Sequence, residues 1–139
     1  MHALVASEPL TPMEACWDWK APSLRIQDSL RARGRSYNGY PVSAGYLGSF
    51  CLDGLAIALH SVYHTDTFDA AIERCVNYRG DADSTAAVAG QIAGAFYGRA
   101  AIGAPLREQL RTWDDDEIAA RGLLLWWLHA PGPLPSTAR

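Results

Sequence analysis

Three features that would identify large classes of protein are missing from this sequence of 139 residues. No apolar run approaches the ~20 residues that cross a bilayer, so no membrane span is expected. The 12 basic and 15 acidic residues leave a net charge of −3, too mild to indicate a nucleic-acid or membrane-surface partner. The first residues lack the basic and apolar regions of a signal peptide. We therefore expect a cytoplasmic protein with no nucleic-acid and no membrane partner.

Cysteine is also scarce. The three cysteines, Cys16, Cys51 and Cys75, lie far apart in the chain and form no C-x-x-C pair. An odd number without that spacing argues against a disulfide framework or a zinc knuckle, and it favours a reducing compartment. Cys75 lies within an apolar pattern, so we expect it in the core.

The composition that is present, 49% hydrophobic and 19% charged, is that of an ordinary globular domain. A chain of this length buries roughly two thirds of its unfolded surface, which is enough for a core. Prolines interrupt residues 1–23, so this segment is predicted to be an irregular lead-in that Trp17 and Trp19 anchor. Residues 24–130 are predicted to form the helical domain, and residues 131–139 a tail.

Apolar residues recur at helical spacing through most of that domain, and no segment shows a convincing strand pattern. The predicted fold class is therefore all-α. Helices are expected over 24–32, 52–62, from the N-cap Thr67 to a break at Arg79, over 85–97, briefly after Pro105, and over 114–128. The helix over 85–97 is apolar all round, which predicts a central, buried element.

Glycine and aromatic residues gather in one stretch, residues 37–50. The glycines interrupt both the helical and the strand period, so the stretch is predicted to be an ordered loop. Glycine allows close backbone approach and aromatic rings offer flat contact area, as a ligand loop requires. A packed connecting loop is equally consistent with the pattern.

Acidic and hydroxyl side chains come together at the start of the 85–97 helix. Asp81 and Asp83 are followed at once by Ser84, and such hard oxygen atoms are the ligands that Mg²⁺ and Ca²⁺ prefer. The same residue types are favoured as N-caps and suit the helix dipole, and spacing alone favours that capping role. The apolar helix that follows supports a cation, because partly desolvated carboxylates need a partner.

Two histidines lie at i and i+4. His60 and His64 have a spacing that can chelate zinc, but Ser61 stands where the metalloprotease pattern requires Glu. No third ligand is evident nearby, so we interpret them as capping or core-edge residues. Asp53 shares a helix face with His60 and is a candidate for orienting it. The acidic run over 114–117 is interpreted as the solvated first turn of a helix.

The run from Asn77 to Gly98, N-Y-R-G-D-A-D-S-T-A-A-V-A-G-Q-I-A-G-A-F-Y-G, resembles the C-terminal metal motif of the ADP-ribosylglycohydrolase family. That family includes the dinitrogenase-reductase-activating glycohydrolase type. Residues 52–60, L-D-G-L-A-I-A-L-H, resemble the helix that precedes the motif, and the similarity extends from about Tyr37 to Leu128. The resemblance implies an all-α domain with two Mg²⁺ ions that hydrolyses the glycosidic bond of ADP-ribose attached to a side chain or small molecule.

The resemblance also implies roles for particular residues. Asp81, Asp83 and Ser84 match the family's C-terminal metal ligands, with Ser84 in place of the commoner threonine. Gly48, Ser49 and Phe50 correspond to the loop beside the ribose and diphosphate. Their backbone amides would bind phosphate oxygens, and Phe50 would pack on the sugar. The implied partner is ADP-ribose or an ADP-ribosylated substrate.

The sequence departs from the family before Tyr37. Family members have an N-terminal half with a Gly-rich segment, further acidic metal ligands and a glutamate implicated in catalysis, and nothing in this region resembles them. We therefore expect a partial domain with the N-terminal half absent, whose catalytic residues are unknown and whose activity alone is open. The alternatives are a non-catalytic module that binds ADP-ribose or metal, and a structural domain in which the acidic residues only cap a helix. Such a partial domain is expected to self-associate through exposed apolar surface.

Overall fold

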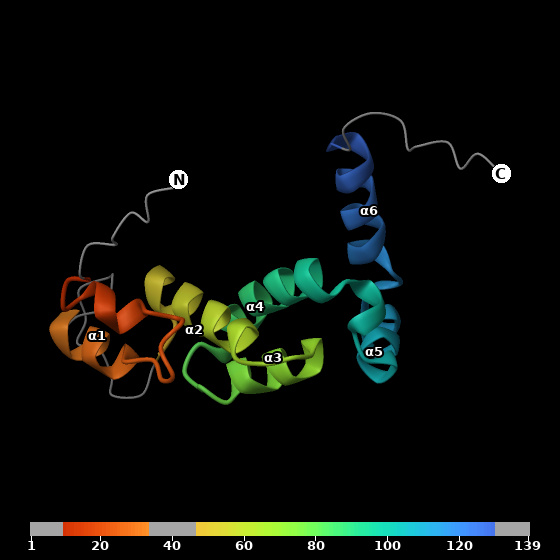
Figure 1. Cartoon of the computed structure of the whole chain (residues 1–139). Coiled ribbons are helices and arrows are strands. Elements are labelled where there is room, and N and C mark those ends of the chain that lie inside the picture. The colour runs from red at the N-terminus through yellow and green to blue at the C-terminus, as the bar shows by residue number, and fades with distance from the viewer. Residues whose placement is uncertain (1–9, 34–46, 130–139) are drawn as a thin grey trace, which may run out of the picture. The chain divides into compact units, whose positions relative to one another are not determined.

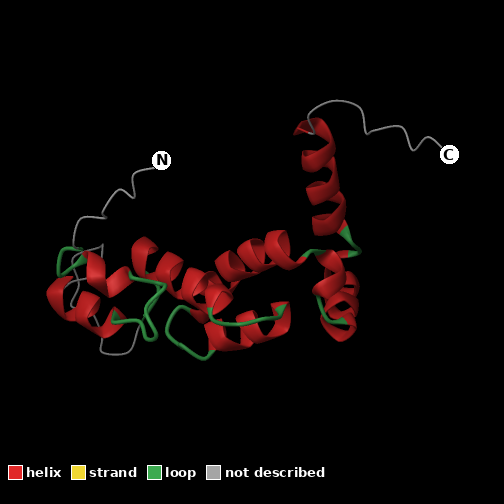
Figure 2. Ribbon diagram, viewed as in Figure 1, coloured by secondary structure: helices red, strands yellow, loops and turns green. Residues whose placement is uncertain are grey.

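The computed structural model describes residues 10–33 and 47–129, and every regular element within these ranges is a helix (Figure 2). The prediction of an all-α fold is thereby confirmed. The chain divides into two compact units, Met1–Ile102 and Gly103–Arg139, and each is described by itself. Among the described helices, none combines the length and the hydropathy that crossing a bilayer requires.

Three helices in mutual contact form the centre of the first unit: α2 (Cys51–Tyr63), α3 (Phe68–Val76) and α4 (Ala82–Tyr97) (Figure 1). Their shared core includes Ile57, Cys75 and Ala89. Cys75 is 0% exposed, which confirms its predicted place in the core. The N-cap prediction at Thr67 is also confirmed, because its hydroxyl accepts a hydrogen bond from the Ala70 N–H.

One stripe of small residues joins α4 to its neighbours. Thr85, Ala89 and Ala93 follow each other at i, i+4 and i+8, and each is at most 1% exposed. The expectation that this helix is buried on all sides is wrong, because α2 and α3, its main neighbours in the described part of the unit, bury this stripe fully and leave the rest of α4 partly or wholly exposed. Away from the stripe, Phe96 is 76% exposed.

The N-terminal segment packs against α2. It contains the short 3₁₀ helix η1 (Glu14–Trp17) and α1 (Ile26–Arg33), whose buried Ile26 belongs to the core around α2. The prediction that the two tryptophans anchor this segment is confirmed. Trp17 donates a hydrogen bond from Nε1 to Asp53 at 2.8 Å, and the Trp19 ring meets Tyr63 edge-on at 5.3 Å between centroids. Of the predicted loop over 37–50, residues 37–46 lie outside the described residues, as does the predicted tail over 131–139.

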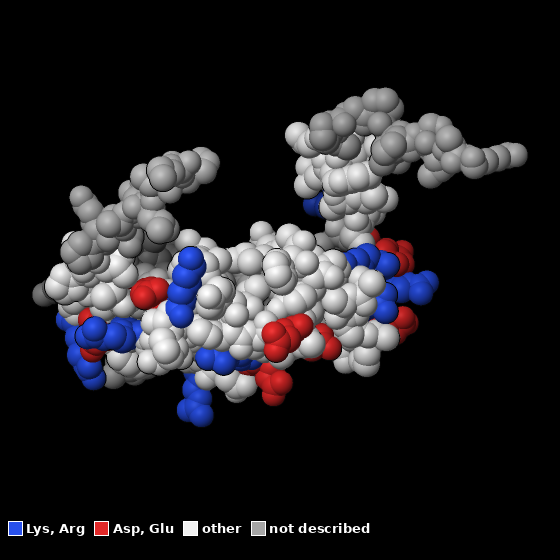
Figure 3. All heavy atoms as spheres, in the orientation of Figure 1, with Lys and Arg blue, Asp and Glu red and all other residues white. Residues whose placement is uncertain are grey.

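The remaining elements are the 3₁₀ helix η2 (Arg99–Ala101) at the end of the first unit, and α5 (Ala104–Asp114) and α6 (Glu117–His129) in the second. Every side chain from Leu123 to Leu128 in α6 is at least 55% exposed. Charged side chains of both signs are interspersed on the face of the described residues that Figure 3 shows. The second half of α6 is thus a run of exposed apolar side chains.

Candidate functional site

Two chain segments meet at the start of α2 and α4. The backbone N–H of Asp81 donates a hydrogen bond to the carbonyl of Leu47 at 2.7 Å. Gly80 has φ +66°, and a Cβ atom there would lie 2.3 Å from the nitrogen and 2.4 Å from the carbonyl oxygen of Leu47. Only glycine permits this approach, because both the left-handed backbone and the space exclude a side chain.

Gly48, the residue after Leu47, is held as closely. Gly48 has φ +89°, and a Cβ atom there would lie 2.6 Å from the Thr85 methyl group at the start of α4. On the other side, a Cβ on Gly54 of α2 would lie 2.9 Å from the Gly48 carbonyl oxygen. The segment over 47–50 is therefore packed between the first turns of the two helices.

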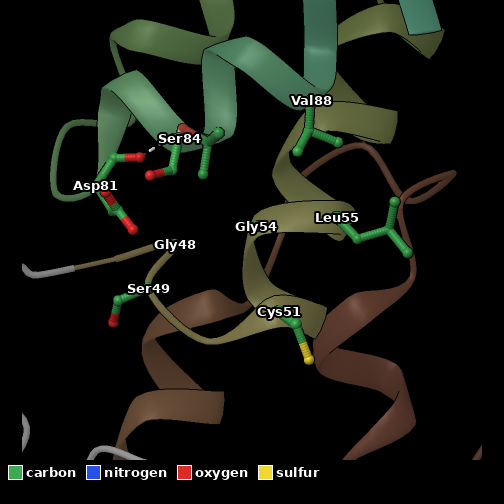
Figure 4. Close-up of a pocket in the computed structure, with 9 residues that line it drawn as sticks. Gly48, Ser49, Cys51, Gly54, Leu55, Asp81, Ser84 and Val88 are labelled. Carbon is green, nitrogen blue, oxygen red and sulfur yellow. Dashed lines mark hydrogen bonds between the residues drawn. The ribbon is translucent and has the colours of Figure 1, made fainter. Parts of the chain in front are cut away.

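A pocket of about 420 Å³ opens where these segments meet, and its lining includes Gly48, Ser49, Leu55, Asp81, Ser84 and Val88. In Figure 4, Asp81 and Ser84 lie together at one end beside Ser49, whereas Leu55 and Val88 lie at the other. The pocket thus has one end of oxygen-bearing side chains and one apolar end. A ligand with a polar group and an apolar part would complement it.

The Asp81 side chain does not act as a helix cap. Asp81 occupies the N-cap position of α4, yet its carboxylate makes no capping hydrogen bond. The backbone carbonyl of Asp81 instead accepts the N–H and the hydroxyl of Thr85, each at 3.0 Å. The partly buried carboxylate therefore lines the pocket without the hydrogen bond that the capping interpretation requires.

Of the six residues that the sequence singled out, the pocket brings together four: Gly48, Ser49, Asp81 and Ser84. Asp83 lies in the first turn of α4, is exposed and does not belong to the pocket lining. Phe50 lies outside the lining as well.

The donor set suits a hard cation in part. Within residues 10–33 and 47–129, no group of three or more His, Cys, Asp or Glu side chains is arranged to hold a metal ion. Mg²⁺ commonly takes only one or two carboxylates from a protein and keeps several waters. The pocket therefore offers two oxygen ligands of the kind that Mg²⁺ accepts, from Asp81 and Ser84, whereas the exposed Asp83 lies outside its lining.

A buried carboxylate whose partners the sequence does not predict lies in the first turn of α2. Asp53 is 0% exposed and accepts hydrogen bonds from Trp17 Nε1 at 2.8 Å and Ser29 Oγ at 2.7 Å. Arg33 forms an ion pair with its second oxygen. These partners are 20 to 36 residues away in the chain, so no local pattern indicates them.

His60 is 0% exposed, so it lies inside the core rather than at the core edge or in a helix cap, where the sequence interpretation put it. The prediction that Asp53 orients it is wrong, because both ring nitrogens have other partners. Arg74 donates to Nε2 at 3.1 Å, so Nδ1 carries the proton and donates to the Trp19 carbonyl at 3.0 Å. Burial lowers the pKa of His60, and the nearby His64 and Arg74 lower it further against the opposing effect of the Trp19 carbonyl. The imidazole is therefore a neutral structural link rather than a zinc ligand.

The sequence profile of the ADP-ribosylglycohydrolase family matches residues 3–131. An ADP-ribosyl-[dinitrogen reductase] glycohydrolase of Rhodospirillum rubrum is 43% identical over 54 residues, which cover 39% of this chain and 18% of that protein. The ADP-ribosylarginine hydrolase Tri1 of Serratia proteamaculans is 44% identical over 68 residues, or 49% of this chain and 18% of that protein. The Tri1 of Pseudomonas putida is 46% identical over 56 residues, or 40% of this chain and 14% of that protein.

The matched segments thus span less than a fifth of these relatives. No solved structure matches the chain. The family profile, in contrast, covers most of the sequence and includes both segments that form the pocket. On this evidence the chain belongs to the ADP-ribosylglycohydrolase family.

Proposed function

We propose that the pocket at the start of α2 and α4 binds Mg²⁺ and ADP-ribose, as part of a site that hydrolyses the glycosidic bond between ADP-ribose and a protein side chain or small molecule. The observation that carries this proposal is the Asp81 carboxylate, which makes no capping hydrogen bond and shares a pocket with Ser84, Ser49 and Gly48. Two relatives, named as hydrolases of ADP-ribosylarginine and of ADP-ribosyl-[dinitrogen reductase], support the reaction class.

Under this proposal the first turn of α4 holds the metal. Asp81, Asp83 and Ser84 would bind Mg²⁺ through their oxygens. When bound, Mg²⁺ would orient the ribose hydroxyls and activate a water molecule for attack at the anomeric carbon. The segment Gly48–Phe50 would contact the ribose and diphosphate, because backbone N–H groups and the Ser49 hydroxyl are donors suited to phosphate oxygens.

A second candidate function is non-catalytic binding of ADP-ribose or metal. It is favoured by the small number of carboxylates in the pocket: among the described residues, Asp81 supplies the one carboxylate of the lining. Glycosidases that work without a metal use two carboxylates, one on each side of the bond. Binding of ADP-ribose without any release of ADP-ribose from a modified arginine would favour this function over hydrolysis.

The metal assignment is tested by thermal unfolding with and without millimolar Mg²⁺. Mg²⁺ at ten times its dissociation constant stabilises the folded chain by about 1.4 kcal/mol, which raises the melting temperature by about 4 °C or more. We expect Asp81→Ala and Asp83→Ala each to abolish this rise. Asp115→Ala, in the acidic segment between α5 and α6, serves as the matched control and keeps it.

The same experiment separates ligation from capping. Removing a carboxylate that only caps a helix lowers the free energy of unfolding by about 1 kcal/mol and leaves the Mg²⁺ response unchanged. If the parent chain shows no response, the measurement is repeated with the N-terminal part of the Rhodospirillum rubrum relative added as a second chain. No response in either case, or an equal loss in Asp115→Ala, would exclude a metal at Asp81 and Asp83.

A further inference from the structure

The buried Asp53 carboxylate joins the N-terminal segment to the first turn of α2. Its three partners, Trp17, Ser29 and Arg33, come from η1, α1 and the end of α1. The Asp53 side chain is 0% exposed and that of Arg33 is 15% exposed, so the ion pair is shielded from water. A shielded pair with further hydrogen bonds holds its members in one geometry, because separating them would leave an unpaired buried charge.

Two of these partners also contact Phe50. The Arg33 guanidinium lies over the Phe50 ring, with its central carbon 4.3 Å from the ring centroid. The Trp17 and Phe50 rings are 6.2 Å apart between centroids and inclined at 38°. The Phe50 side chain is therefore held by two groups that Asp53 itself fixes.

Phe50 in turn continues directly into the wall of the pocket. Its carbonyl accepts the Gly54 N–H at 2.9 Å, which begins the hydrogen bonding of α2. Gly48 and Ser49, the residues just before it, line the pocket. The carbonyl of Leu47 accepts the Asp81 N–H at 2.7 Å. A continuous set of contacts thus leads from Asp53 through Phe50 to Asp81.

We propose that Asp53 and Arg33 are positioning residues for the candidate site: with Trp17 they hold Phe50, and Phe50 holds the segment over 47–49 against Asp81. The role of this segment in ligand binding rests on the proposed function, whereas the mechanical link does not. The N-terminal segment therefore acts as a support for the pocket wall as well as a cover for the core.

Hydrogen exchange of single backbone amides tests the link without any ligand. In Arg33→Met, we expect the Asp81 amide to exchange about tenfold faster, the factor that corresponds to loss of a charge-assisted hydrogen bond. The Ala71 amide, which donates to the Thr67 carbonyl in α3, should keep its rate. Arg33→Lys keeps the charge between Asp53 and the ring, so its Asp81 amide should exchange near the rate of the parent chain.

Two further variants complete the design. Phe50→Leu removes the ring without leaving a buried charge, and it should accelerate Asp81 exchange even if Arg33→Met does not fold. Arg31→Met is the matched control on α1, since Arg31 is 77% exposed and forms an ion pair with Asp28. Equal acceleration at Asp81 and Ala71 would show general destabilisation, and no acceleration would show that the segment is held by other contacts. Either result overturns the proposal.

A binding measurement separates this proposal from the proposed function. In the presence of Mg²⁺, we expect Arg33→Met to bind ADP-ribose about tenfold more weakly than the parent chain, and Arg31→Met to bind equally well. The parent chain could fail to bind ADP-ribose while Asp81 exchange in the variants still accelerates as expected. That combination would support the positioning link and contradict the proposed function. Unchanged affinity in Arg33→Met, with binding by the parent chain, would contradict the positioning role.

Discussion

At the scale of single residues, the pocket depends on how closely two backbones approach each other. Gly80 allows the Asp81 backbone nitrogen to lie 2.7 Å from the Leu47 carbonyl oxygen. This hydrogen bond places the Asp81 side chain next to Gly48 and Ser49. The position of the candidate metal ligand therefore follows from a residue that has no side chain. The chemistry of the site and its backbone geometry are encoded by neighbouring residues of one short motif.

This dependence predicts a large effect of one methyl group. Gly80→Ala introduces a Cβ atom that would overlap the Leu47 backbone and strains a left-handed conformation, so we expect a loss of at least about 2 kcal/mol in the free energy of unfolding. Gly94→Ala is the control on α4, where a Cβ atom meets nothing within 4 Å. It should be neutral or stabilise by about 0.5–1 kcal/mol, because alanine favours a helix. Chemical denaturation measures both, and equal effects would contradict the close backbone contact.

Sequence reasoning identified the pocket residues Asp81, Ser84 and Ser49 because they belong to short, characteristic runs. It did not identify the partners of Asp53. Trp17 is 36 residues away and Arg33 is 20 residues away, and contacts over such separations follow from the packing of helices rather than from local spacing. For the same reason the local pattern predicts that Asp53 orients His60, the nearest polar group on its own helix face.

At the scale of elements, α4 connects the site to the core. Its first turn carries the candidate ligands, and its stripe of Thr85, Ala89 and Ala93 lets α2 and α3 approach closely. Small residues at i, i+4 and i+8 are what such close packing on one side of a helix requires. The position of the ligands relative to the segment over 47–50 is thus set by side chains that carry no chemistry.

Overpacking of this stripe should be costly. Ala93→Leu adds three carbons at a position that is 0% exposed, and we expect a loss of about 1–3 kcal/mol in the free energy of unfolding. Ala87→Leu makes the same change at an exposed position of the same helix and should change stability by less than about 0.5 kcal/mol. Comparable losses in the two variants, measured by thermal unfolding, would be inconsistent with the stripe.

Helix boundaries could be predicted where apolar spacing is regular and less well where acidic residues intervene. The expected helix over 52–62 is observed as Cys51–Tyr63, whereas α4 begins at Ala82, three residues before the expected start. An acidic residue is favourable in a first turn, so Asp83 belongs to the helix rather than to the loop. The prediction that the acidic run over 114–117 forms the first turn of the last helix is correct only in part: Asp114 ends α5 and accepts the Ile118 N–H, and α6 begins at Glu117.

At the scale of the whole molecule, the exposed apolar surface stands out. Phe96 in the first unit and the run from Leu123 to Leu128 in the second expose apolar side chains that soluble monomers usually bury.

The chain is therefore expected to self-associate and to bind a hydrophobic dye more strongly than an ordinary monomer of its size. The double variant Leu124→Ser and Trp127→Ser should show lower dye fluorescence and a lower apparent mass, because both side chains are more than half exposed. Leu52→Ser, at a less exposed position of α2, should have a smaller effect. Dye fluorescence and light scattering over a concentration series measure this, and a monodisperse monomer that binds no dye would contradict the expectation.

The central claim is that one pocket, formed at the start of α2 and α4, binds ADP-ribose together with Mg²⁺. Calorimetric titration of ADP-ribose into the chain, with millimolar Mg²⁺ and again with a chelator, tests this claim most directly. We expect binding that requires Mg²⁺, is lost in Asp81→Ala and is retained in Asp115→Ala. Binding that is indifferent to Mg²⁺ and to Asp81→Ala, or no binding at all at millimolar ligand, would contradict it.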